Sequence, residues 1–320
     1  MTNPDSGGGR EQDDPHWLPP KPKPDRSLIV AGIVVSLGLV VGLVFSLFGG
    51  PSAILGSDDA DEVTIGTTEG GADFWPILQR LADHNGIKIK VVNFADYSQP
   101  NPALAQGQTD LNLFQHLQFL ASYNVAADQT LTPIGSTVVV PLGLYSKHYT
   151  AVKDIPPGAD VAIPNDPTNQ ARALLVLQQA GLVKLKGGGS TISTPADVEP
   201  QGTLVKVVPI SAQQTVTSLP SVAAAVINNG FALDANLDPS SAIYNDDPNS
   251  PAAEPYINAF VARDQDKNNP TYLKIVELYH DPEVVKAVLD ASRDTAVIVD
   301  KPAAELQRIT SDLEAQIRQK

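Results

Sequence analysis

From Asp61 to the end of the chain, short apolar runs alternate with stretches whose apolar residues recur at helical spacing. The apolar runs predict strands at 63–67, 87–94, 111–114, 136–146, 160–164, 204–210, 223–228 and 256–263. The helical spacing predicts helices at 73–86, 102–107, 116–123, 167–180, 272–279, 282–292 and 302–319. Repeated strand–helix alternation is typical of mostly parallel sheets with helices on both faces, and 260 residues suffice for two such sheets.

The apolar run that begins at Val161 leads directly into a helix. Asp166 supplies a capping carboxylate, and Pro167 takes the first helical position, where its missing N–H is not needed. Gly181 is a typical residue for the end of that helix. We expect the core face of the helix at Ala171, Leu174 and Leu175.

Arg172 lies about 100° around the helix from Ala171, at the flank of this core face. Its side chain leans back toward the helix N-terminus, beside free backbone N–H groups at the carboxyl end of a strand. Open α/β sheets bind anionic ligand groups at that place. Arg172 is therefore a candidate for a ligand carboxylate, although an ordinary surface arginine would show the same local pattern.

The N-terminal segment has a different composition from the rest of the chain. Residues 1–26 contain six prolines and mixed charge, which predicts a disordered tail. The 21 residues from Leu28 to Phe48 carry no charge, and a helix of that length spans the hydrocarbon core of a bilayer. We assign a transmembrane helix to 27–49 and a linker to 50–60, and we expect no cleavage, because signal peptides have shorter apolar regions.

Basic residues lie on one side of this apolar span. Lys21, Lys23 and Arg26 precede it, whereas the first basic residue after it is Arg80. The positive-inside rule therefore places the N-terminus in the cytoplasm and the chain beyond about Ser52 outside the cell membrane.

The composition excludes several classes of function. The chain has no cysteine, so disulfides, thiolate metal sites and lipid attachment to an N-terminal cysteine are ruled out. A net charge of −14 without a basic run beyond the N-terminal segment argues against nucleic acid as a partner. The five histidines lack ligand spacing, and no nucleophile and base pair is recognisable, so we expect no metal, no cofactor and no enzymatic activity.

Two further stretches affect the prediction. The predicted strand at 136–146 contains Pro141, which fits an edge strand or a crossover better than a central strand. The glycine-rich sequence at 66–71 follows a strand but lacks dinucleotide-binding spacing, so it predicts a tight turn whose N–H groups could still face a ligand.

Polar and aromatic residues follow several predicted strands, where open α/β sheets bind ligands: Tyr97, Phe114, His116, Arg172, Asn228 and Asn258. Each also has an ordinary structural role, as a core aromatic, a helix-capping histidine or a turn-forming asparagine. Together they supply a guanidinium, amides and an aromatic wall, a combination that suits a small amino acid.

Four segments, DYSQPNPALAQGQTDLNLFQH (96–116), VAIPNDPTNQARALLVLQQAGLVKLK (161–186), AVINNGFA (225–232) and EPYINAFVAR (254–263), carry a family resemblance. They resemble the NlpA/MetQ family of methionine-binding proteins of ABC importers. The resemblance implies a type II periplasmic-binding-protein fold whose two α/β lobes close on the ligand. We expect lobe I at 61–139 plus 256–320 and lobe II at 140–255.

The resemblance also implies roles for the candidate residues. Arg172 would hold the α-carboxylate, Asn228 and Asn258 the amino-acid head group, and Tyr97, Phe114 and His116 would line the side-chain pocket. We expect Phe119, three residues after His116 on the predicted helix, to border the same pocket, at a position where the family usually has tyrosine. The chain departs further from the family in its membrane span, which replaces a lipidated cysteine, and in the helix at 303–319.

These observations predict a membrane-anchored, extracytoplasmic solute-binding protein. It would bind methionine or a related amino acid and deliver it to an ABC permease and its ATPase. The same scaffold could bind a different amino acid or a short peptide, or act as a sensor. An anchored hydrolase is a further alternative, which turnover of an ester or peptide would reveal.

Overall fold

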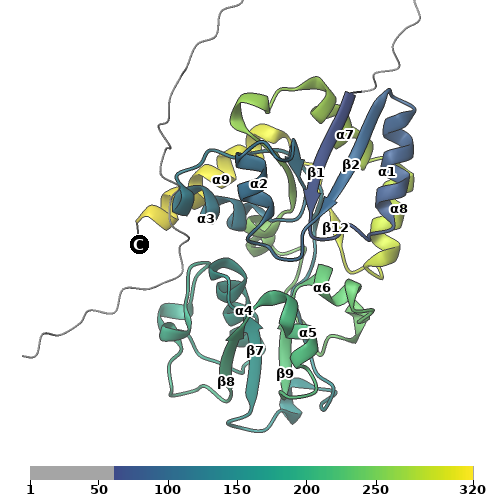
Figure 1. The fold of residues 1–320 in the computed structure, drawn as a ribbon. Coiled ribbons are helices and arrows are strands. Elements are labelled where there is room, and N and C mark those ends of the chain that lie inside the picture. Colours follow the sequence, from purple (N-terminus) through teal and green to yellow (C-terminus); the bar gives the residue numbers. More distant parts are fainter. Residues whose placement is uncertain (1–60, 320) are drawn as a thin grey trace, which may run out of the picture. The chain divides into compact units, whose positions relative to one another are not determined.

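A computed structural model describes residues 61–319, which form two α/β lobes, each built on one sheet (Figure 1). The predicted tail at 1–26, membrane span at 27–49 and linker at 50–60 lie outside the described residues. Within residues 61–319, none of the helices is both long enough and apolar enough to cross a membrane.

Lobe I contains a mixed sheet in the order β2-β1-β3-β11-β4. Its strands are β1 (Asp61–Thr67), β2 (Ile87–Asn93), β3 (Leu111–Asn112), β4 (Thr132–Ser136) and β11 (Ala259–Ala262). β1 runs parallel to β2 and β3, whereas β11 runs antiparallel to β3 and β4. The parallel part was expected from the strand–helix alternation, and β11 makes the sheet mixed because the chain enters it from the other lobe.

Helices cover both faces of the lobe I sheet, as predicted (Figure 1). One face packs against α1 (Phe74–Asp83), α7 (Pro270–Tyr279) and α8 (Pro282–Ala291). The other face packs against α2 (Pro100–Ala105), α3 (Leu117–Ala127) and α9 (Ala303–Arg318). Alternating residues of β11 serve the two cores: Phe260 faces the first, and Val261 faces the second.

Lobe II contains the second sheet, in the order β10-β6-β9-β7-β8. Its strands are β6 (Gly143–Tyr145), β7 (Asp160–Pro164), β8 (Lys206–Ile210), β9 (Ala224–Ile227) and β10 (Tyr244–Asn245). The helix α4 (Pro167–Gln179) covers one face, and α5 (Thr215–Ser218) and α6 (Asn229–Asp234) cover the other. Short 3-10 helices lie at Val152–Asp154, Lys186–Gly188, Pro195–Asp197, Ala212–Gln214, Pro239–Ser241, Pro251–Tyr256 and Asp264–Asp266.

The chain crosses between the two sheets twice. The first crossing, residues 140–142, follows β5 (Val138–Val139) and contains Pro141. The second crossing, residues 246–258, leads from β10 back to β11. The prediction of a single strand at 136–146 is therefore wrong. The segment begins with the last residue of β4 and then contains β5, the first crossing and β6. Its interpretation as a crossover segment is confirmed.

The sequence pattern missed β4, because Thr132–Ser136 contains both Pro133 and Gly135. β4 lies at the edge of its sheet, where a proline is tolerated. A Cβ atom built on Gly135 would lie 2.1 Å from Cγ1 of Val276, so α7 packs where a side chain would otherwise stand. Tertiary packing, which local propensity does not report, therefore explains this strand.

The C-terminal helix α9 is an integral part of lobe I (Figure 1). β12 (Val297–Ile298) pairs with β5 and directs the chain toward it. Leu306, Ile309 and Leu313 are buried against α3 and β5. α9 therefore packs against α3 and stabilises its position in lobe I.

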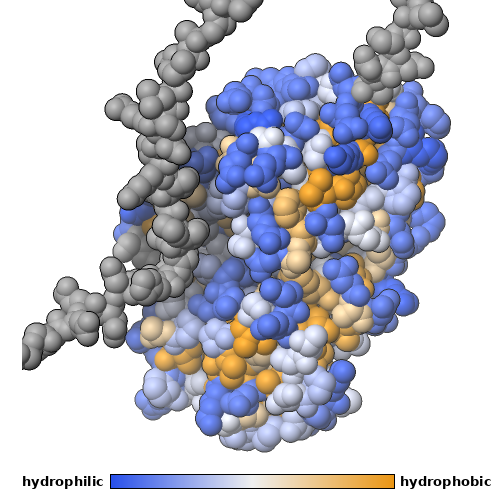
Figure 2. All heavy atoms as spheres, in the orientation of Figure 1, coloured by the Kyte–Doolittle hydropathy of each residue, from blue (hydrophilic) through white to orange (hydrophobic). Residues whose placement is uncertain are grey.

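Figure 2 shows that hydrophilic residues cover most of the visible face of the described chain, interrupted by apolar patches in both halves. Among the described residues, Leu204 and Leu273 are the large apolar side chains classed as exposed. The cores of the two lobes therefore hold most of the apolar residues that the sequence pattern identified.

Candidate functional site

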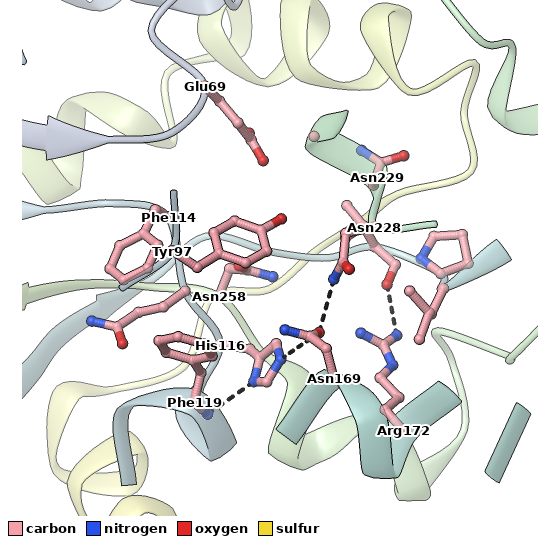
Figure 3. A pocket seen from close by; sticks show the side chains of 15 residues that line it. Glu69, Tyr97, Phe114, His116, Phe119, Asn169, Arg172, Asn228, Asn229 and Asn258 are labelled. Atoms are coloured by element: carbon pink, nitrogen blue, oxygen red, sulfur yellow. Dashed lines mark hydrogen bonds between the residues drawn. The ribbon is translucent and has the colours of Figure 1, made fainter. Parts of the chain in front are cut away.

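A cavity lies where the two lobes meet, and Figure 3 shows the residues that line it. All seven residues predicted from the sequence border this cavity: Tyr97, Phe114, His116, Phe119, Arg172, Asn228 and Asn258. Residues that were not predicted also border it: Glu69, Gln115, Val140, Pro141, Leu142, Asn169, Asn229 and Gly230. The lining therefore comes from both lobes and from the first crossing.

The helix α4 begins as its sequence predicted. Asp166 is the N-cap, and its Oδ1 accepts a hydrogen bond from the backbone N–H of Asn169 at 2.9 Å. Pro167 is the first helical residue, and Gly181, with φ of 76°, follows the C-cap. The predicted core face of Ala171, Leu174 and Leu175 was too narrow, because α4 buries further residues against its own sheet and against the other lobe. Leu175, which was predicted to be in the core, is only half-buried.

Arg172 is buried, which contradicts the alternative of an ordinary surface arginine. Its Nε and Nη2 donate to the Asp246 carboxylate at 2.7 and 3.1 Å, and Nη2 also donates to the Val140 carbonyl at 2.9 Å. The guanidinium carbon lies 4.2 Å from the centre of the Tyr256 ring. The guanidinium was expected beside free backbone N–H groups, and the groups to which it donates hydrogen bonds are the Asp246 carboxylate and the Val140 carbonyl.

The Asp246 carboxylate forms a bidentate pair with Nε and Nη2 of Arg172. Nη1 makes no hydrogen bond with another residue in the described range, and Arg172 borders the cavity. The arrangement fixes the guanidinium in orientation and leaves one nitrogen for a further acceptor. Asp246 is 74 residues away from Arg172 in the sequence, and no local signal identified it.

His116 is a helix cap and a cavity residue at the same time. Its Nδ1 accepts a hydrogen bond from the backbone N–H of Phe119 at 3.1 Å. Because Nδ1 is an acceptor, Nε2 carries the proton and donates to Oδ1 of Asn169 at 3.3 Å. Burial and the nearby Arg172 charge lower the pKa of His116 to about 3, so the imidazole is neutral near pH 7.

Asn169 links the two lobes, and sequence reasoning missed it. Its Oδ1 accepts from His116 of lobe I and from Nδ2 of Asn228 at 2.8 Å. Its Nδ2 donates to Asp166 at 3.0 Å, which fixes the orientation of the amide. Its place one turn before Arg172 on α4 was the available signal.

Aromatic rings form one wall of the cavity. The ring centres of Tyr97 and Phe114 lie 6.1 Å apart, and Phe119 lies 5.7 Å from Phe114 at an interplanar angle of 80°. Tyr97 also lies 4.8 Å from Phe231 of lobe II. Phe119 is half-buried, and these tilted and edge-on ring contacts produce an apolar surface that suits a thioether or aliphatic group.

The two predicted asparagines differ in how they are held. Oδ1 of Asn228 is buried and has no hydrogen-bond partner among residues 61–319. Nδ2 of Asn258 donates weakly to the Val138 carbonyl at 3.3 Å, and the backbone of Asn258 bridges to that of His116. An unsatisfied buried oxygen beside the cavity is an acceptor available to a ligand donor.

Three buried amides support the loop that carries Phe114 and His116. Asn101 donates to Gln115 at 2.8 Å, Asn112 donates to Asn101 at 2.9 Å, and Gln115 donates to both asparagines. The predicted strand at 111–114 ends at Asn112, because the chain leaves the sheet there and enters the cavity wall. Fully paired buried amides of this kind fix a single conformation.

Glu69 borders the cavity from the loop that follows β1. Burial, together with the charge of Asp234, raises the pKa of Glu69 to about 7. The glycine-rich sequence at 66–71 predicts a tight turn, and this pattern does not single out its acidic residue. Among residues 61–319, no group of three or more histidine, aspartate or glutamate side chains could hold a metal ion.

Two α/β lobes that enclose a polar and aromatic cavity beside two chain crossings define a two-lobed solute-binding protein of the periplasmic type. The chain belongs to the NlpA lipoprotein family, whose model matches residues 63–299.

Individual relatives agree with this assignment. The D-methionine-binding lipoprotein MetQ of Escherichia coli is 34% identical over 258 residues, which cover 76% of this chain and 94% of that protein. The crystal structure of protein PG110 from Staphylococcus aureus has a TM-score of 0.75 and 40% identity, covering 78% of this chain and 99% of that one. A nutrient-binding protein from Burkholderia cenocepacia, solved with bound methionine, has a TM-score of 0.67 and 35% identity, covering 74% and 99%.

Proposed function

We propose that this protein is the solute-binding component of an ABC importer and that it binds methionine or a related amino acid between its two lobes. The observation that carries the proposal is the cavity, where one guanidinium, several amides and an aromatic wall converge from both lobes. The names of the relatives, which include methionine-binding proteins, support the choice of ligand.

In this proposal each group of lining residues has one task. Nη1 of Arg172 binds the ligand carboxylate, while Asp246 keeps the guanidinium in place. Asn228 and Asn258 bind the polar head group, and Tyr97, Phe114, His116 and Phe119 enclose the side chain. No bond is broken, so the protein acts by binding and release and is not an enzyme.

The protein would act outside the cytoplasm, attached to the cell membrane through the apolar segment at 27–49. The chain contains no cysteine that could carry a lipid, so this segment takes the place of a lipid anchor. The lobes, at 61–139 plus 256–320 and at 140–255, would present the ligand to a permease and its ATPase.

Thermal unfolding of the full chain with a panel of ligands tests this function. Ligand present at 100 times its dissociation constant adds about 2.7 kcal/mol to the free energy of unfolding. We expect L- or D-methionine to raise the melting temperature more than leucine, glutamine or a dipeptide does. If another ligand raises the melting temperature more than methionine does, that ligand is the better candidate. If none of them raises it, amino-acid binding is contradicted.

A further inference from the structure

The side chain of Glu69 points into the cavity from lobe I, facing Asn228 and Asn229 of lobe II (Figure 3). It also packs directly against lobe II. A Cβ atom built on Gly230 would lie only 2.3 Å from Oε1 of Glu69, so the carboxyl group rests against the backbone at the start of α6. A side chain at position 230 would therefore displace the Glu69 carboxyl group.

The backbone of Glu69 is held by hydrogen bonds, whereas its carboxyl group has no hydrogen-bond partner among residues 61–319. The backbone N–H donates to Oγ1 of Thr67 at 3.1 Å, and the carbonyl accepts from Nε1 of Trp75 at 2.9 Å. The carboxyl oxygens make no hydrogen bond or ion pair with any other residue in the described part of the chain. A carboxylate without a hydrogen-bond partner, at the edge of the cavity, is thus available to a ligand.

The Glu69 carboxyl group forms no ion pair with a cation among residues 61–319. The positive charge of Arg172 is matched by Asp246 at 2.7 Å, and His116 is neutral near pH 7. The groups that face Glu69 or share its adjoining cavity are Asp234 of α6, Tyr97, Tyr279 of α7, Asp73, Asp238, Asp290 and Arg293. Most of these charges are negative, so the environment of the carboxylate favours the arrival of a cation.

We propose that Glu69 determines ligand specificity by accepting the ammonium group of the ligand. The proposal rests on the proposed function, since it assigns one more residue to the same cavity. A charge-assisted hydrogen bond from an ammonium group would satisfy the carboxylate that the protein itself leaves unpaired. The ligand class is then a zwitterion with a free amine, and an N-acylated amino acid is excluded.

This role makes ligand binding dependent on pH. Only ionised Glu69 can pair with an ammonium group, and its pKa is raised to about 7 by burial and by Asp234. Affinity should therefore fall by about 10-fold between pH 8 and pH 6, as Glu69 takes up a proton. Near pH 7, binding should release a proton to the buffer, because the bound cation stabilises the ionised form.

Isothermal titration calorimetry of the full chain with L-methionine and N-acetyl-L-methionine tests the proposal. We expect Glu69→Gln to weaken methionine binding at pH 8 by at least about 30-fold and to remove its pH dependence. The wild type should prefer methionine to N-acetyl-methionine strongly, and Glu69→Gln should reduce that preference. Asp234→Asn is the matched control: it should keep the affinity at pH 8 and reduce the loss at pH 6.

The possible results separate this proposal from the function on which it rests. If the wild type binds methionine and Glu69→Gln binds it equally well with the same pH dependence, Glu69 has no role in specificity and the binding function stands. If the folded wild type binds none of these ligands, the function itself fails. A cooperative melting transition of Glu69→Gln without ligand shows whether that variant is folded.

Discussion

Asp246 accepts hydrogen bonds from Nε and Nη2 of Arg172, at 2.7 and 3.1 Å. The same carboxylate accepts from the backbone N–H of Leu142 at 2.7 Å. Asp246 lies in the second crossing and Leu142 in the first, so one side chain connects both crossings to α4. The cavity arginine is thus held by both segments that join the two lobes.

Removing Asp246 should destabilise the protein strongly. In the pair, 4% of the Arg172 side chain and 15% of the Asp246 side chain are exposed, and breaking a buried pair leaves an uncompensated charge. We expect Asp246→Ala to lower the free energy of unfolding by about 3 kcal/mol, measured by urea denaturation. The exposed pair of Arg308 and Asp312 is the control, and Asp312→Ala should cost less than about 1 kcal/mol.

Arg172→Lys should weaken methionine binding nearly as much as Arg172→Ala does. Lysine cannot bond to Asp246 with two nitrogens and still present a third to a ligand. We expect a loss of roughly 2 to 5 kcal/mol in binding for both variants, measured by calorimetry. Unchanged affinity in the lysine variant would show that Arg172 supports the fold without contacting the ligand.

Glu69 and His116 should have opposite effects on stability as the pH changes. Folding lowers the pKa of His116 from 6.5 to about 3, so its contribution to stability is lost as the pH falls below 6.5. Folding raises the pKa of Glu69 from 4.5 to about 7, so its contribution is lost as the pH rises from 4.5 to 7. The two effects nearly cancel between pH 4.5 and 6.5.

Single substitutions should reveal each effect. Relative to the wild type, Glu69→Gln should lose stability on acidification from pH 6.5 to 4.5, whereas His116→Gln should gain stability over the same range. The slopes should approach about 1.4 kcal/mol per pH unit, with opposite signs. Urea denaturation at several pH values measures them, and parallel curves for all three proteins would contradict both pKa shifts.

Phe119→Tyr should change ligand preference. The ring borders the cavity beside Phe114, and a hydroxyl group there would offer a polar ligand one hydrogen bond. We expect the affinities for methionine and glutamine to shift relative to each other by about 1 kcal/mol. Both proteins are titrated with methionine, leucine and glutamine. If Phe119 only fills space, the differences in affinity among these ligands will be the same in the two proteins.

Truncating the core of the C-terminal helix should destabilise lobe I. Leu306 is fully buried in the cluster that joins α9 to α3, so Leu306→Ala should lower the free energy of unfolding by about 2 to 5 kcal/mol. Leu273 of α7 is 39% exposed, and Leu273→Ala is the matched control with a much smaller effect. Equal losses in urea denaturation would show that α9 does not support the lobe.

Local signals explain why much of the fold was predictable. Asp166, Pro167 and Gly181 define the ends of α4 without any tertiary contact, and the seven site residues follow from strand ends together with the family resemblance. The lipoprotein family model stops at residue 299, so α9 was visible only as a helical pattern. Its function in the core depends on packing that the pattern does not contain.

The missed residues depend on distant contacts. Asp246 pairs with an arginine 74 positions earlier, and Asn169 acts through a histidine 53 positions earlier. Glu69 is surrounded by turn-forming residues, and its raised pKa results from burial and from Asp234 in the other lobe. Sequence spacing identifies neighbours along one element, whereas these residues acquire their environment only through contacts between distant parts of the chain.

The amide network of Asn101, Asn112 and Gln115 shows what one of the segments that carry the family resemblance, residues 96–116, does in the structure. The side chains at those three motif positions hydrogen-bond to one another, and they fix the backbone that carries Phe114 and His116. A search for this motif would therefore collect proteins that share one loop geometry, whatever each transports. Sorting such a collection by cargo would require reading the residues at positions 69 and 119 as well.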